Sequence, residues 1–361
     1  MSELLTTPLN AWHKLNGARM VPFAGWEMPV QYTGIIEEHK HTRSQASIFD
    51  ISHMGEFLLH GPGAESALSA LMTHNLSTLA VGKCRYGFLL NDQGGVLDDL
   101  IIYRLAEDSF MLVVNGACID SDYAWISTHL PSQVHLENRS AQTAKIDLQG
   151  PLSCDILSAV LPGDWTSLGY FGFRHAEFDG ASLLISRTGY TGELGYEIYL
   201  PWDKAPGLWT ALLNDERVRP AGLGARDTLR LEVGLPLYGQ DLDAYHTPVE
   251  AGYGAMLTSP AQFTGKDALS TVRERLIGLR IEGRRSARHH DPVWVGEEQV
   301  GAITSGSFAP SLGYCIALAY VRPDMAEQTD FTIKTAKTVL DAKRVDLPFY
   351  TAGTARKKLT A

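Results

Sequence analysis

Short strands closed by glycine-rich turns recur along this sequence and restrict it to folds that contain antiparallel sheets. The clearest hairpin runs from Ala181 to Thr188, turns at Gly189-Tyr-Thr-Gly192, and returns from Glu193 to Leu200. A further strand, Val96 to Leu105, follows the turn Asn91-Asp-Gln-Gly-Gly95. Helical patterns at residues 34–47 and 222–233 stand between such strands, so the sequence predicts an α+β protein.

The chain is too long for a single compact core. Its 361 residues exceed the length that one hydrophobic core usually serves, and 45% of them are hydrophobic, as in ordinary globular proteins. After Lys266 the composition changes to short strands with glycine turns, such as Val300 to Gly306 and Ile316 to Val321. We therefore expect two or three domains, the last of them a small β-rich unit.

Charge and hydrophobic pattern exclude some classes of protein. The formal net charge of −10 argues against a general nucleic-acid binder, because phosphate binding favours a basic surface. The apolar runs are too short to span a bilayer, and the first residues lack the pattern of a signal or transit peptide. We expect a cytoplasmic protein that binds neither nucleic acid nor membrane; a processed organellar protein would show the same pattern.

The sequence contains no recognisable metal-binding spacing. The cysteines stand far apart among apolar neighbours, which is typical of reduced core thiols: Cys84, Cys118, Cys154 and Cys315. Neither His53 nor the pair His289-His290 lies in zinc-ligand spacing. We therefore expect no metal, and interpret His53 as structural and the histidine pair as solvated.

The strand from Val96 to Leu105 carries two adjacent aspartates among apolar residues. Because alternate residues of a strand share a face, Asp99 is expected beside Ile101 and Tyr103, with Asp98 on the opposite face. A carboxylate on an apolar face is costly to desolvate unless it has a partner. Either one aspartate is exposed at the strand edge and the other caps a turn, or one of them is functional, in which case Asp99 is the better candidate.

Two more segments admit both a structural and a functional interpretation. Glu197 lies on the mixed face of the returning hairpin strand, where it either meets water or accepts the paired N–H donors of an aminopyrimidine ring. Tyr190, in the turn, would then supply an aromatic wall. The helix predicted from Gly222 has Arg226 near its N-terminus; it is either a salt-bridged surface helix or a site for an anionic or electron-rich ligand.

Nine segments follow one another in a specific order between residues 23 and 350. They are Phe23-Ala-Gly-Trp-Glu-Met-Pro29, Phe49-Asp-Ile-Ser-His-Met-Gly-Glu56, Gly94-Gly-Val-Leu-Asp-Asp-Leu100, Leu148-Gln-Gly-Pro151, Ser186-Arg-Thr-Gly-Tyr-Thr-Gly-Glu193, Arg219-Pro-Ala-Gly-Leu-Gly-Ala-Arg-Asp227, Leu237-Tyr-Gly-Gln-Asp241, Gly301-Ala-Ile-Thr-Ser-Gly306 and Pro348-Phe-Tyr350. Together and in this order, they resemble the glycine cleavage T-protein, or aminomethyltransferase, family.

The resemblance implies a three-domain cloverleaf around a central folate cavity. The first domain of the folate-binding module would be discontinuous and comprise residues 1–51 and 138–240. The second domain would comprise residues 52–137 and 241–275. Residues 276–361 would form a C-terminal β-barrel domain.

The resemblance also implies roles for individual residues. Asp99 matches the family's essential aspartate beside the reactive nitrogens of folate, and Glu197 matches the carboxylate that holds the pterin. The remaining matches in the folate pocket are three tyrosines and two arginines: Tyr86, Tyr170, Tyr190, Arg226 and Arg356.

The implied reaction uses tetrahydrofolate as co-substrate and the lipoylated H-protein of the glycine cleavage system as partner. A folate nitrogen attacks the methylene of the aminomethyl-dihydrolipoyl arm, ammonia leaves, and methylenetetrahydrofolate and the free dithiol arm are released. Asp99 would orient the folate and stabilise developing positive charge, or accept a proton.

Two alternative functions are compatible with the same resemblance. The nearest is a folate-dependent demethylase of a small methyl donor, and the second is a non-enzymatic folate-binding accessory protein. Relatives of the second kind carry K-G-C-Y-x-G-Q-E, which Lys83-Cys-Arg-Tyr86 does not reproduce.

The sequence departs from the family pattern at two places. Ala255 replaces a common tryptophan, and the stretch from Arg284 to Asp291 is unusually basic. Both could alter the surface that receives the lipoyl arm or the partner protein.

Overall fold

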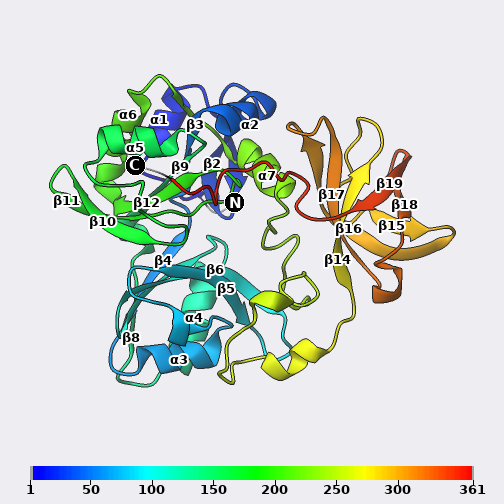
Figure 1. Ribbon diagram of the computed structural model, residues 1–361, viewed down its shortest axis with the longest axis horizontal. Coiled ribbons are helices and arrows are strands. Elements are labelled where there is room, and N and C mark those ends of the chain that lie inside the picture. Colours follow the sequence, from blue (N-terminus) through cyan, green and yellow to red (C-terminus); the bar gives the residue numbers. More distant parts are fainter. Residues whose placement is uncertain (1–2, 360–361) are drawn as a thin grey trace.

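The computed structural model describes residues 3–359, which form three lobes (Figure 1). The first lobe contains a six-stranded sheet, the second a five-stranded sheet, and the third a closed six-stranded barrel. A separate pair of strands, β1 (Arg19–Phe23) and β2 (Trp26–Gln31), lies in the first lobe. This architecture confirms the predicted α+β class and the expected C-terminal barrel.

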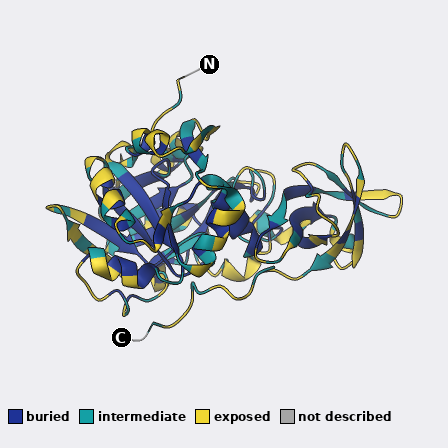
Figure 2. Ribbon diagram, turned by 90° about the horizontal axis from the view of Figure 1, so that it is seen from above, coloured by how far each residue is buried: buried dark blue, intermediate teal, exposed yellow. Residues whose placement is uncertain are grey.

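In the six-stranded sheet, the central strands are buried on both faces. Its order is β10-β11-β12-β9-β3-β13, antiparallel except for the parallel pair β13–β3. Its apolar face, which includes Ile146 and Ile198, packs beneath three helices. The elements are β3 (Ala46–Asp50), β9 (Thr143–Gln149), β10 (Phe173–Phe178), β11 (Ala181–Ser186), β12 (Gly195–Pro201), β13 (Val218–Pro220), α1 (Asn10–Leu15), α5 (Ser153–Val160) and α6 (Ala205–Leu213). Figure 2 shows buried residues along these strands and exposed residues mainly on helices and loops.

The five-stranded sheet, of order β5-β6-β7-β4-β8, is covered by helices on one face only. The other face turns toward the six-stranded sheet, where the hydroxyl oxygen of Tyr103 lies 2.9 Å from those of both Ser186 and Tyr199. Two sheet faces with polar residues therefore meet inside the molecule. The elements are β4 (Gly55–His60), β5 (Cys84–Leu90), β6 (Val96–Ala106), β7 (Ser109–Val114), β8 (His135–Asn138), α3 (Ala64–Leu71) and α4 (Ile119–His129).

The barrel closes in the order β14-β17-β16-β15-β18-β19 around its own apolar core. Helix α7 (Leu223–Glu232), which packs against α2 (Ile35–Ser44), joins the barrel to the first lobe because its Leu231 contacts Ile316 and Leu318. The barrel strands are β14 (Arg275–Ile281), β15 (Pro292–Val295), β16 (Glu298–Ala309), β17 (Tyr314–Val321), β18 (Asp330–Lys334) and β19 (Val339–Val345). Short 3-10 helices lie at residues 76–78, 140–142, 202–204, 254–256, 266–270 and 323–325.

The chain after β19 returns from the barrel to the first lobe (Figure 1). The amide of Tyr350 donates to the carbonyl of Glu232 at 2.7 Å, and the amide of Ala355 donates to the carbonyl of Gly192 at 3.1 Å. These contacts bring the last part of the chain next to the hairpin turn before β12.

Most local predictions agree with the structure. The predicted helices correspond to α2 and α7, the predicted strands to β6, β11 and β12, and the four cysteines are buried and free. Among residues 3–359, no helix combines the length and apolar character needed to cross a bilayer. The domain boundaries stay a prediction; in their support, strands β3 and β9 of the first sheet flank the whole of the second sheet in sequence.

Candidate active site

Strand β6 presents its two aspartates to opposite faces of the five-stranded sheet. Asp98 is fully buried on the face of Leu100 and Ile102, which pack in the core with α3 and α4. Asp99 shares the other face with Tyr103, the face that turns toward the six-stranded sheet. The predicted alternation is confirmed, and the interpretation that places one aspartate exposed at the strand edge is wrong, because Asp98 is buried beneath the helices and Asp99 is half-buried on the opposite face.

The Asp99 carboxylate is held by two neighbouring donors. The hydroxyl of Tyr86, on β5, donates to Oδ2 at 2.9 Å, and Nδ2 of Asn115, just after β7, donates to Oδ1 at 2.9 Å. Burial raises the pKa of Asp99 to about 7, and the charge of Asp98 adds to the shift. A carboxyl with this pKa exchanges its proton near neutral pH, which suits general acid–base chemistry.

Glu197 lies on the polar face of β12 and is only 3% exposed. Nζ of Lys145 lies 2.8 Å from Oε1, and the hydroxyl of Thr188 donates to Oε2. Burial disfavours the charged form, but Lys145 and Thr188 outweigh it and hold the pKa of Glu197 below its ordinary value. The interpretation that this face meets water is therefore wrong, since the second lobe covers it.

Arg226 joins this group through Asp147, the cross-strand neighbour of Glu197. Nη1 of Arg226 donates to Oδ2 of Asp147, and the guanidinium carbon lies 4.9 Å from the centroid of the Tyr190 ring. The Tyr190 hydroxyl donates in turn to the carbonyl of Pro236. Burial raises the pKa of Asp147 to about 6 in spite of the nearby guanidinium. The first turn of α7 thus delivers Arg226 to the polar face between the sheets.

Five of the predicted site residues gather where the two sheet faces meet. Tyr86 bonds to Asp99, and Tyr190 stacks on Arg226. Burial raises the pKa of Tyr190, and the charge of Asp99 contributes to that shift, so the two pairs act on each other. The set consists of Tyr86, Asp99, Tyr190, Glu197 and Arg226, whose roles in ligand binding stay predictions.

Tyr170 and Arg356 form a second, more exposed contact. The guanidinium carbon of Arg356 lies 5.8 Å from the centroid of the Tyr170 ring, and both side chains are exposed. Burial of the hydroxyl raises the pKa of Tyr170, and Glu197 is among the charges that act on it. Tyr170 is therefore within electrostatic range of Glu197, and contact of Tyr170 and Arg356 with folate stays a prediction.

Three groups that hold the site were not identified from the sequence. Asn115 stands in the turn dipeptide Asn-Gly, which marks the end of a strand but says nothing of its contacts with Asp99. Lys145 and Asp147 alternate with apolar residues along β9, a pattern typical of a strand with one face in water. Their burial depends on the second lobe, which the local pattern does not contain.

Arg230, on the barrel side of α7, is also buried by a part of the chain distant in sequence. Its side chain is 1% exposed, and Nη1 lies 2.6 Å from Oδ2 of Asp241, which is fully buried. Nη2 also donates to Oγ of Ser305, on β16, at 2.8 Å. The interpretation of this helix as a salt-bridged surface helix is therefore wrong, because the barrel covers it.

His53 and Glu56 are buried polar residues with incomplete hydrogen bonding. Within residues 3–359, Nδ1 of His53 and both carboxylate oxygens of Glu56 have no hydrogen-bond partner. Burial lowers the pKa of His53 to about 4, so this imidazole is neutral at pH 7, and burial raises the pKa of Glu56 well above its ordinary value. Lys145 and Glu197 are the charges that act on Glu56, which places it beside the site.

The positively charged cluster of the barrel domain is separate from this region. Arg284, Arg285 and Arg288, here called the basic loop, are all exposed after β14. His289 and His290 are exposed as expected and line a cleft of about 780 Å³ against β16, whose lining includes none of the predicted site residues.

Comparison with known proteins identifies the family over almost the whole chain. The GCVT N-terminal domain model matches residues 9–259, and the glycine cleavage T-protein C-terminal barrel domain model matches residues 274–351. The aminomethyltransferase of Desulfitobacterium hafniense (strain Y51) is 45% identical over 337 residues, 91% of this chain and 92% of that protein. The aminomethyltransferase of Halothermothrix orenii is 44% identical over 353 residues, 95% of this chain and 99% of that protein.

A solved structure extends the match to the fold. The glycine cleavage system aminomethyltransferase T from Bartonella henselae is similar with a TM-score of 0.92 and 34% identity, over 99% of this chain and 100% of that chain. The resemblance found in the sequence is confirmed, and the protein is an enzyme of the aminomethyltransferase type. This chain belongs to the glycine cleavage T-protein family.

Proposed function

We propose that the protein transfers the methylene group of an aminomethyl-dihydrolipoyl arm, carried by the H-protein of the glycine cleavage system, to tetrahydrofolate with release of ammonia. Membership of the family supports this reaction, and we propose that it takes place in the cytoplasm. The observation that carries the proposal is the Asp99 carboxyl, which is half-buried, held by two donors and has a pKa near neutrality.

The donor and acceptor set of the site fits a reduced folate. An aminopyrimidine edge presents parallel N–H donors, and a carboxylate such as Glu197 has lone pairs free to accept them after its bonds to Lys145 and Thr188. The Tyr86 and Tyr190 rings provide aromatic surface near Asp99. The unpaired oxygens of Glu56 are a further place where a polar ligand group would complete the hydrogen bonding.

We assign ligand binding and proton transfer to different residues of the site. Bound tetrahydrofolate supplies the nucleophilic nitrogen that receives the one-carbon unit. Tyr86 and Asn115 fix the Asp99 carboxylate in one orientation, so its oxygens stabilise positive charge that develops nearby or take up a proton. Glu197, kept ionised by Lys145, holds the ligand in register with Asp99.

The basic loop is our proposed docking surface for the H-protein. Its three arginines are exposed in a chain of net charge −10, so they form a local positive patch for an acidic carrier. Attraction between exposed charges is screened over roughly 8–10 Å at physiological ionic strength, so docking there would depend on salt.

The direct test is turnover with the carrier. Purified protein is mixed with aminomethyl-loaded H-protein and tetrahydrofolate, and ammonia and methylenetetrahydrofolate are quantified by mass spectrometry. We expect both products in equal amounts, and we expect Asp99→Asn to reduce turnover much more than Asp98→Asn. Absence of products with H-protein, together with demethylation of a small methyl donor, would assign the chain to folate-dependent demethylation instead.

A further inference from the structure

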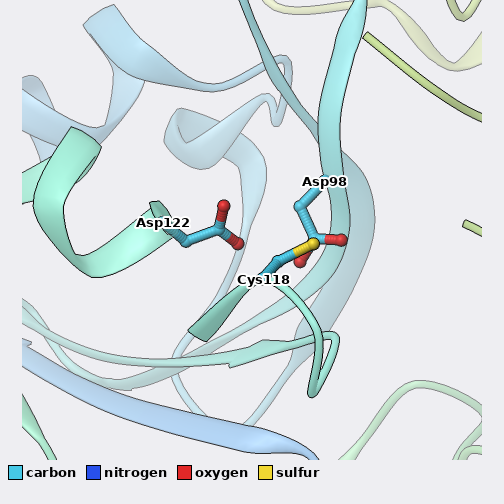
Figure 3. Close-up of side chains that lie close together, drawn as sticks. All are labelled: Asp98, Cys118 and Asp122. Atoms are coloured by element: carbon cyan, nitrogen blue, oxygen red, sulfur yellow. The ribbon is translucent and has the colours of Figure 1, made fainter. Parts of the chain in front are cut away.

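Behind Asp99 lies a buried acidic cluster to which the proposed reaction assigns no role. It consists of Asp98 on β6, Cys118 at the N-cap of α4, and Asp122 in the first turn of that helix (Figure 3). One carboxylate oxygen of each aspartate and Sγ of Cys118 lie within 4.8 Å of one another. Asp98 is fully buried and Asp122 is 2% exposed.

Asn115 connects this cluster to the site. Its backbone N–H donates to Oδ2 of Asp98 at 2.9 Å, and its Nδ2 donates to Oδ1 of Asp98 at 2.8 Å. The same Nδ2 donates to Oδ1 of Asp99 at 2.9 Å. The side-chain amide of Asn115 thus bonds to both aspartates and connects the position of Asp98 to that of Asp99.

The hydrogen bonds indicate where a proton resides. Two buried carboxylates at this separation cannot both be ionised without a compensating charge. Both oxygens of Asp98 accept N–H donors from Asn115, which stabilises its ionised form. Oδ2 of Asp122 has no partner within residues 3–359, and Figure 3 shows the Asp122 carboxyl pointing toward Asp98 and Cys118.

We propose that Asp122 is a neutral acid that donates its proton in a hydrogen bond to the Asp98 carboxylate, and that this pair positions Asn115 and, through it, Asp99. The inference rests on the proposed role of Asp99 in the transfer reaction. Burial and then the charge of Asp98 raise the pKa of Asp122 to about 10, in agreement with a proton held at neutral pH. Asp98 and Asp122 are positioning residues, since neither faces the region between the sheets.

The other titratable groups around the pair come from four elements. Asp99 and Tyr86 lie on the site side, on β6 and β5, and the charge of Asp98 acts on Asp99. Cys118 stays a thiol because burial and the two aspartates raise its pKa, and its Sγ points to the carbonyl of Leu97 at 3.9 Å. Tyr238, in the segment after α7, is neutral as well, and its pKa is raised by burial and by these acids.

The first test locates the proton spectroscopically, in full-length protein. Infrared spectra of wild type, Asp122→Asn and the control Asp120→Asn, an exposed aspartate two positions earlier in α4, are recorded at about pH 8.5, between the pKa values of Asp99 and Asp122. We expect the carbonyl band of one neutral carboxylic acid to disappear in Asp122→Asn and to persist in Asp120→Asn. No lost band in a folded Asp122→Asn variant overturns the proposal.

The second test asks whether the pair positions Asp99. An asparagine at 122 keeps an N–H donor for Asp98, so Asp122→Asn should recover most of the turnover lost in Asp122→Ala, for which we expect a loss of about tenfold or more. Burial raises the pKa of Asp99 most, and the charge of Asp98 adds to it; Asp98→Asn removes that second contribution, so the acidic limb of the pH–rate profile should move to lower pH. Equal damage from both substitutions at 122, or an unmoved limb in Asp98→Asn, contradicts the positioning role.

A cation bound by the same three side chains is the competing explanation of the cluster. Elemental analysis of the purified protein decides between them: we expect no stoichiometric metal, and a metal that is present in wild type and lost in Asp122→Asn would overturn the shared proton. If wild type fails to turn over aminomethyl-loaded H-protein, the proposed function fails, whereas the infrared result still decides the protonation of Asp122.

Discussion

Replacing the proposed catalytic Asp99 should make the protein more stable, and increasingly so as the pH rises. The ordinary pKa of this carboxyl is 3.8 and its pKa in the folded protein is about 7. The folded state therefore binds more protons than the unfolded state between these values, so the contribution of Asp99 to stability is lost as pH rises through the folded pKa. Each pH unit in this window is worth about 1.4 kcal/mol.

The magnitude follows from the two pKa values. Below pH 3.8 the acid is neutral in both states, at about pH 5 it costs the folded state roughly 1.6 kcal/mol, and above pH 7 it costs roughly 4 kcal/mol. Asp99→Asn removes this dependence. The new amide also opposes the Nδ2 donor of Asn115, but that penalty does not change with pH and cancels when two pH values are compared.

The assay is the melting temperature of wild type and Asp99→Asn at about pH 5 and pH 8. The advantage of the variant should grow by about 3 kcal/mol, or roughly 6–12 °C at 2–4 °C per kcal/mol for a cooperative unit of 150–250 residues. Asp92→Asn, at an exposed position in the turn before β6, is the control and should change the melting temperature equally at both pH values. A difference between wild type and Asp99→Asn that stays constant or shrinks with rising pH would refute the reasoning.

Three further variants test folate binding, docking of the partner and the buried ion pair of α7. Glu197→Gln should weaken tetrahydrofolate binding by about 1.5–3 kcal/mol in calorimetry, the range for charged hydrogen bonds. The control Glu177→Gln, on the exposed part of β10, should leave the affinity unchanged. Equal affinities for both variants would contradict the role of Glu197. Replacing the three arginines of the basic loop with alanine should raise the KM for H-protein at low salt and leave kcat intact, and an unchanged KM would exclude docking there. Asp241→Asn leaves the buried guanidinium of Arg230 without its closest counter-charge and should destabilise the protein by about 3–5 kcal/mol in denaturant unfolding, so a loss below 1 kcal/mol would show that the pair is dispensable.

Local patterns in the sequence predict a residue's position correctly where that position depends only on its own strand or helix. The period of two along β6 separates Asp99 from Asp98, and the structure has the same separation. Along β9, Lys145 and Asp147 lie two residues apart, and in the structure they share a face. This spacing does not show whether that face meets water, because the answer depends on a second sheet whose strands lie between β3 and β9 in the chain.

The partners of Arg226 and Arg230 also depend on contacts between distant elements, which a local pattern does not contain. Their spacing of four residues predicts neighbours on one side of a helix, and salt bridges on such a helix usually face solvent. In the structure each arginine reaches a buried aspartate on a different element, Asp147 on β9 and Asp241 after α7. Pairing over long sequence distances, which burial makes necessary, has no signature in a single sequence.

The polar region between the sheets has one imbalance that points to the chemistry of its occupant. This face has two ion pairs, Lys145 with Glu197 and Arg226 with Asp147. In each pair one positive charge is matched by one carboxylate. Within residues 3–359, Asp99 and Glu56 form no ion pair, and burial raises the pKa of each carboxyl. Uncompensated acids in a buried region are stabilised when a ligand brings N–H donors or positive charge. A neutral apolar ligand would leave Glu56 without a hydrogen-bond partner and the charge of Asp99 without a counter-charge, so the site favours a ligand rich in N–H groups, or one that becomes positively charged during the reaction.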